Sequence, residues 1–153
     1  MSKNKEKLFQ YLKSQKLMSL ATYGKEVAVC NVYYALDKDF NFYLITPPST
    51  EHAQNIAKNK KVACAVVDSA QKVTDKKVGA QIKGNASKIR SLGKLVVALR
   101  MWGQVNPGME SIINIENIKK KIIRSTAYKI EPTSIKFFNE GLYGEKESEL
   151  FKF

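Results

Sequence analysis

The sequence has few of the residues that build metal and disulfide sites. It contains one histidine, His52, and two cysteines, Cys30 and Cys64, among 153 residues. The cysteines lie in apolar, strand-like runs without metal-ligand spacing, so we expect buried free thiols and no metal. With a single histidine and no pair of carboxylates in an apolar setting, the chain also lacks the groups that catalyse hydrolysis.

Long apolar runs are missing as well. No run approaches the roughly 18 residues of a membrane-spanning helix. The amino terminus, MSKNKEKLFQ, lacks the apolar stretch of a secretion signal. We therefore expect a soluble, cytoplasmic protein without a membrane partner. At 153 residues, 44% of them hydrophobic, the chain can bury one core, and we predict a single domain over 1–153.

Arginine is scarce although the chain is basic. The formal net charge is +12, and three of the 26 basic residues are arginines. A positive charge favours nucleic acid, a membrane surface or an acidic ligand as partner. Proteins that read phosphates or base edges rely on arginine, and the lysines here are dispersed. Nucleic-acid binding is therefore the weakest of the functions that we consider.

What the sequence does contain is short β-branched and aromatic runs separated by turn residues. Short turns at 24–26 and 37–39 link the first three runs, which predicts antiparallel hairpins. This pattern predicts a small closed or split β-barrel with flanking helices, and a sandwich is the alternative. The predicted strands are 18–23, 27–36, 42–45, 62–67, 78–89, 127–130 and 134–138. Helical spacing predicts helices over 3–16, after Thr50 and from Leu92, and more weakly within 109–124. We expect the tail after Gly144 to be partly disordered.

The segment 42–67 reads as strand, loop, short helix and strand. Ser49 or Thr50 can cap the helix, and Asn59 ends it. The amino end of the helix offers unpaired N–H groups, the Thr50 hydroxyl and the His52 imidazole, a combination that favours an anionic phosphate. The alternative is an ordinary connector helix that begins with a hydroxyl cap.

Three further features allow more than one interpretation. Gln81 and Lys83 lie on the same face of strand 78–89, which is either solvated or part of a site. For Trp102 there are three interpretations: the side chain fills the core, lies at an interface, or packs against a planar ligand. Strand 62–67 is apolar on both faces, which suggests that a second subunit or a ligand covers it.

Several strings together resemble the pyridoxamine 5'-phosphate oxidase-related, FMN-binding split-barrel family. They are MSLAT at 18–22, NVYYALDKDFNFYLIT at 31–46, TEHAQNIAKNKKVA at 50–63 and QIKGNASKI at 81–89. The resemblance runs from about residue 17 to 138 and is greatest to an uncharacterised bacterial branch. It implies a six-stranded antiparallel split barrel and a homodimer with two FMN sites at the subunit interface.

The resemblance also implies which residues form the cofactor site. The flavin ring would lie along the second strand, and the phosphate would lie at the start of the helix. The implied residues are Cys30, Asn31, Val32, Tyr33, Ile45, Thr46, Thr50 and His52. To these we add Gln81, two residues beyond the position of the oxidase glutamine and on the same face, and Lys83 as a supplementary cation for the phosphate.

Some positions depart from the oxidase pattern. The oxidases place serine, arginine and lysine where Thr50, Glu51 and His52 stand, and glutamine where Gly79 stands. Their Arg-Leu-x-Pro is replaced by residues 129–132, Lys-Ile-Glu-Pro, which loses the bidentate arginine. We therefore do not expect oxidation of pyridoxine phosphate.

The sequence thus predicts an FMN-dependent oxidoreductase that takes electrons from NADH or NADPH. No catalytic residue is assigned, because the flavin supplies the chemistry. The alternative is a carrier or sensor that binds flavin or a haem-like ligand without turnover, since relatives in this fold are implied to include haem users. His52 is the one histidine for axial haem ligation.

Overall fold

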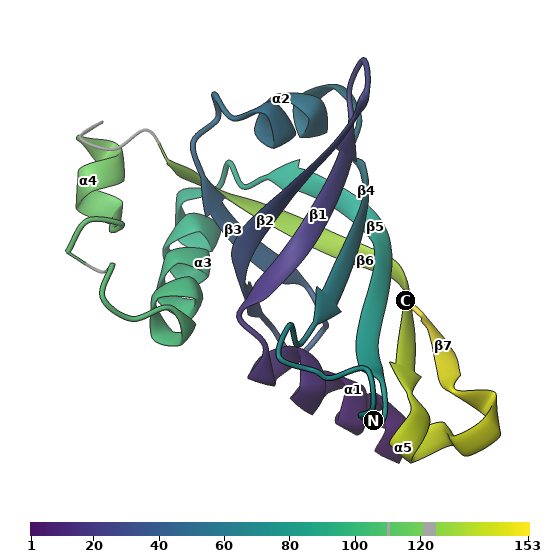
Figure 1. Cartoon of the computed structure of the whole chain (residues 1–153). Coiled ribbons are helices and arrows are strands. Elements are labelled where there is room, and N and C mark those ends of the chain that lie inside the picture. Colours follow the sequence, from purple (N-terminus) through teal and green to yellow (C-terminus); the bar gives the residue numbers. More distant parts are fainter. Residues whose placement is uncertain (110, 121–124) are drawn as a thin grey trace.

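The computed structural model describes residues 1–109, 111–120 and 125–153. The described chain forms an antiparallel barrel with flanking helices and one additional strand (Figure 1). The strands are β1 Leu17–Tyr23, β2 Val27–Leu36, β3 Phe42–Thr46, β4 Lys61–Val67, β5 Val78–Lys88, β6 Thr126–Asn139 and β7 Ser148–Lys152. Their order is β3-β2-β1-β4-β5-β6-β7, and pairing of β3 with β6 closes a barrel of the first six. The six-stranded barrel predicted from the sequence is confirmed.

Strand alternation fills the barrel interior. Leu20 on β1 pairs with Cys64 on β4, which pairs with Ile82 on β5. All three side chains are 5% exposed or less. One residue in two therefore points into the core, as the period of a strand requires.

Two helices close the ends of the barrel. Helix α1, Lys3–Ser14, lies across one end and buries Leu8 and Leu12 completely. Helix α2, Glu51–Lys58, lies across the other end (Figure 1). The Asn55 side chain of α2 is buried and donates a hydrogen bond to Thr22 Oγ1 at 3.2 Å, which fixes the helix to β1.

The helix predicted from Leu92 is α3, Leu92–Val105, which packs outside the barrel against β2, β3 and β6. Its buried residues include Ala98 and Leu99. Of the weaker pattern within 109–124, the structure describes α4, Ile115–Lys119, while positions 110 and 121–124 lie outside the described residues. The remaining helices are α5, Glu140–Tyr143, and the 3-10 turn η1, Gly144–Lys146.

The prediction of two strands around Pro132 is wrong, because β6 runs through that residue as one strand of 14 residues. Its register against β5 shifts between Lys83 and Gly84, opposite Pro132. A Cβ on Gly84 would lie 2.5 Å from the Glu131 carbonyl oxygen. The bulge thus accommodates a proline that cannot donate to the ladder, and glycine permits the close approach of the two backbones.

The expected disorder after Gly144 is also wrong. Residues Ser148–Lys152 form β7, which pairs with β6 and buries Phe151. The Lys5 ammonium lies 4.2 Å from the centroid of the Phe153 ring, so the carboxyl end also contacts α1. Among the described residues, no helix has the length and apolarity needed to cross a membrane.

Candidate functional site

Strand β2 is longer than the part of it that β3 covers. β1 pairs with β2 from Val27 to Tyr33, whereas β3 pairs only with Tyr34–Leu36. Within the described chain, the edge of residues 27–33 that faces away from β1 therefore has no neighbouring strand. This opening between β2 and the end of β3 is the split in the barrel.

The direction of the backbone groups at this edge follows from two hydrogen bonds. The Tyr34 N–H donates to the Lys16 carbonyl, on the side of β1. The Tyr33 carbonyl accepts from Trp102 Nε1 at 3.2 Å, on the opposite side. Because residues two apart direct their backbone groups to the same side of a strand, Asn31 and Val29 present their N–H and C=O groups to the split.

A cluster of three polar side chains lies where β3 ends and α2 begins. Thr46 Oγ1 is 2.9 Å from His52 Nε2 and 3.4 Å from Thr50 Oγ1. The Thr50 hydroxyl is 3.1 Å from the same histidine nitrogen. Thr46 is 6% exposed, and the other two side chains are half-buried.

The hydrogen-bond directions assign the histidine tautomer. The Thr50 hydroxyl donates its single hydrogen to the Pro47 carbonyl at 2.9 Å, so it can only accept from His52. A proton on Nε2 satisfies this contact and the contact with Thr46. In that tautomer Thr46 accepts from the ring, and its hydroxyl hydrogen points to Thr50 Oγ1 at 3.4 Å, a long contact that a ligand acceptor can replace.

The electrostatics of the cluster favour a neutral imidazole. Burial lowers the pKa of His52 below its ordinary value of 6.5, and the neighbouring Glu51 carboxylate opposes this to a smaller extent. Thr50 occupies the N-cap position of α2, yet its side chain makes no capping hydrogen bond. The hydroxyl-cap alternative is therefore not realised, and the Thr50 side chain does not occupy the N–H groups of the first turn.

The predicted residues of β2 and β3 border the split, although their side chains point in different directions. Cys30 and Val32 are half-buried and pack against the barrel core, whereas Asn31 and Tyr33 are exposed on the outer face. Ile45 packs against the small cluster beneath α3. Burial raises the pKa of the Cys30 thiol, and the Glu51 carboxylate adds to this. The thiols are free, as predicted, with Cys64 buried and Cys30 half-buried.

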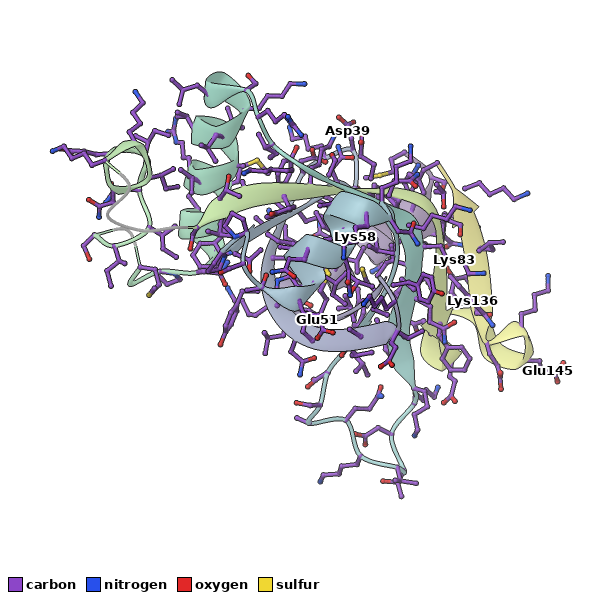
Figure 2. The ribbon with its side chains drawn as sticks, turned by 90° about the horizontal axis from the view of Figure 1, so that it is seen from above. Asp39, Glu51, Lys58, Lys83, Lys136 and Glu145 are labelled. Carbon is purple, nitrogen blue, oxygen red and sulfur yellow. The ribbon has the colours of Figure 1, made fainter. Side chains whose placement is uncertain are left out.

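Gln81 and Lys83 are exposed on the outer face of β5, away from this cluster. Lys83 shares a surface hollow of about 550 Å³ with Asn59, which caps the carboxyl end of α2. Figure 2 shows Lys83 beside Lys136, apart from Glu51 at the start of α2. Within one chain, Lys83 therefore does not reach the Thr46, Thr50 and His52 cluster, and its role at the phosphate stays a prediction.

Two contributors to the site were not assigned from the sequence, the backbone of Val29 and the hydrogen bond from Trp102 to Tyr33. The backbone of Val29 was missed because a free strand edge depends on where pairing stops. A signal was present, since the predicted strand 27–36 is more than twice as long as the predicted strand 42–45. The link from Trp102 to the Tyr33 carbonyl carried no local signal, because 69 residues separate the two.

Comparison with solved structures shows the same fold at low sequence identity. A haem-binding protein from Mycobacterium smegmatis has a TM-score of 0.74 at 16% identity, over 99% of this chain and 59% of that one. The conserved hypothetical protein Rv2991 of Mycobacterium tuberculosis has a TM-score of 0.74 at 17% identity, over 94% and 88%. A NimC/NimA family protein from Clostridium acetobutylicum has a TM-score of 0.69 at 13% identity, over 97% and 91%.

A search of curated proteins found no match. The sequence profile described as pyridoxamine 5'-phosphate oxidase matches residues 5–139, which include every strand of the barrel and the whole of the candidate site. The chain therefore belongs to the pyridoxamine 5'-phosphate oxidase family.

Proposed function

We propose that this chain binds FMN and acts as an oxidoreductase that takes electrons from NADH or NADPH. The observation that carries the proposal is the free edge of β2, at Val29 and Asn31, beside the cluster of Thr46, Thr50 and His52. The pyrimidine edge of a flavin carries N–H and C=O groups, which can pair with a free strand edge as a neighbouring strand would. Bound FMN would supply the electron-transfer chemistry, and the chain would orient the ring and hold the phosphate.

The residues at the cluster fit a phosphate through neutral donors. They offer the Thr46 hydroxyl and the N–H groups at the start of an eight-residue helix, and the Nε2–H of the neutral His52 ring holds Thr46 in place. Neither arginine nor lysine stands at positions 50–52. We therefore expect the phosphate to add less affinity than a site with charge-assisted hydrogen bonds would provide.

The proposed active form is a homodimer. The outward faces of β1, β2 and β4 together expose an apolar surface that no other described part of the chain covers, and Val27 and Val29 are 72% and 68% exposed. Residues of this apolar face are Leu17, Ala21, Tyr23, Val27, Val29, Ala63, Ala65 and Val67. Contiguous apolar surface of this kind is typical of a subunit interface, and a second copy would cover it and enclose the split.

The test begins with the absorption spectrum of the purified protein, followed by titration with FMN and riboflavin. A colourless protein that gains no flavin peaks with FMN would contradict the proposal. Thr46→Val removes the hydroxyl while keeping the shape of the side chain. A hydrogen bond to a charged group contributes about 1.5 to 3 kcal/mol. This variant should therefore weaken FMN at least about 10-fold and leave riboflavin unchanged. Thr74→Val, in an exposed loop, is the matched control.

A carrier of flavin or haem is the second candidate, because a haem-binding protein shares the fold. His52 argues against haem here, since Thr46 and Thr50 both contact its Nε2. Protein-dependent oxidation of NADH or NADPH with added FMN separates an oxidoreductase from a passive carrier. Nucleic-acid binding would instead appear as retardation that weakens steeply as salt is raised.

A further inference from the structure

A second cavity lies beside the split, where the end of α3 meets the start of β1. Its volume is about 550 Å³, within the range of small-molecule sites. Its wall is formed by Lys16, Tyr33, Trp102, Asn106, Pro107 and Met109. Tyr33 borders both the split and this cavity, and Lys16, Asn106, Pro107 and Met109 have no part in the proposed binding of FMN.

The aromatic wall of the cavity is held in place by hydrogen bonds. Trp102 is 7% exposed, and its Nε1 donates to the Tyr33 carbonyl at 3.2 Å. The Asn106 side chain donates to the Trp102 carbonyl at 3.0 Å. Tyr33 is 54% exposed, so much of its ring is available to a ligand. A fixed indole beside an exposed phenol ring suits a flat, aromatic ligand.

The charge on the wall is positive. Lys16 Nζ donates one hydrogen bond, to the Val105 carbonyl at 2.7 Å, and an ammonium group has three N–H donors. None of the described lining residues is acidic. The Lys16 contact also offsets the negative end of the α3 dipole, which would otherwise repel an anion.

We infer that this cavity binds a planar aromatic anion, such as an aromatic carboxylate, with its ring against Tyr33 and its charge near Lys16. The cavity is a substrate subsite, an inference that rests on the proposed function. Tyr33 is two residues from Asn31, about 7 Å along the strand. A ligand in the cavity would therefore lie beside a ring held at the β2 edge.

The probes for this site are 4-(trifluoromethyl)benzoate and its neutral isostere, 4-(trifluoromethyl)benzamide. Fluorine NMR titration of the flavin-free chain measures both affinities, and fluorescence of the one tryptophan reports occupancy of the cavity. The benzoate should bind about 5-fold more tightly than the benzamide, because an exposed ion pair contributes up to about 1 kcal/mol. Lys16→Gln should abolish this preference, while Tyr33→Ala should weaken both probes.

Lys13→Gln is the matched control, because it removes the same charge from the exposed side of α1. Equal affinity of the two probes in the wild type, or an equal effect of Lys13→Gln and Lys16→Gln, would overturn the inference. So would the absence of saturable binding of either probe. The same titrations with FMN separate the two proposals: flavin binding without benzoate selectivity refutes the subsite alone, and the reverse result refutes the flavin site alone.

Discussion

Replacement of His52 by glutamine should remove the pH dependence of FMN binding. In the free chain, burial lowers the pKa of His52 below 6.5, so the ring is neutral at pH 7. A phosphate beside it would favour the protonated ring and raise this pKa in the complex. FMN binding would then take up a proton, so affinity should rise as the pH falls. Glutamine keeps an N–H donor but cannot become charged.

The size of this effect follows from Coulomb energies. Two unit charges about 4 Å apart at an effective dielectric constant of about 20 interact by about 4 kcal/mol. His52 is half-buried, so we halve this energy to allow for solvent screening. The remaining energy of about 2 kcal/mol corresponds to about 30-fold in affinity. The gain should grow as the pH falls through the pKa of the ring in the complex, and it should stop growing near about pH 6, where the phosphate takes up its own proton.

The folding stability of the free chain should fall as the pH falls, in the opposite direction to the FMN affinity. Its folded-state pKa at His52 lies below the unfolded value of about 6.5. The associated stability is therefore complete above that pH and is lost as the pH falls below it.

Flavin fluorescence titrations between pH 5.5 and 8 measure the affinities of wild type and His52→Gln for FMN. Riboflavin, which lacks the phosphate, is the control for pH effects elsewhere in the site. A wild-type ratio of FMN to riboflavin affinity that does not change with pH would refute the reasoning. If the glutamine variant keeps the full dependence of FMN affinity on pH, the effect belongs to a group other than His52.

Three further predictions concern the fold and the apolar face. Gly84→Ala should destabilise the chain by about 1 to 3 kcal/mol in denaturant unfolding, since a Cβ there meets backbone. Gly93→Ala, in helix α3 with open space around it, should stabilise by about 0.5 to 1 kcal/mol, and equal effects would contradict this account. Val29→Lys should convert the proposed dimer to monomer in sedimentation, whereas Val73→Lys, at a side chain 91% exposed, should not; a dimer that persists in Val29→Lys would place the interface elsewhere. Burial raises the pKa of the Cys64 thiol to about 12, so thiol reagents at pH 8 should label it only after unfolding; rapid labelling of the folded chain would disprove this burial.

Much of the architecture is determined locally and was readable from the sequence. The short connection at Gly24 predicts a hairpin, and β1 and β2 do pair in antiparallel register. The boundaries of α2 and α3 follow from the loop residues beside them, such as Asn59 and Asn106. Turn chemistry and side-chain periodicity act between neighbours in the chain, which is why a single sequence reveals them.

The remainder depends on contacts between distant segments. β6 continues through Pro132 because Gly84, on another strand, lets the two backbones approach at the bulge. The tail becomes β7 because the edge of β6 is open to it. Sequence order indicated that Thr50 and His52 lie together, but only the return of the loop to the end of β3 brings Thr46 Oγ1 within 2.9 Å of His52 Nε2. The split lies where β3 leaves β2: β3 pairs with β6 along its whole length but with β2 only at Phe42–Leu44, and this arrangement is a property of the whole sheet.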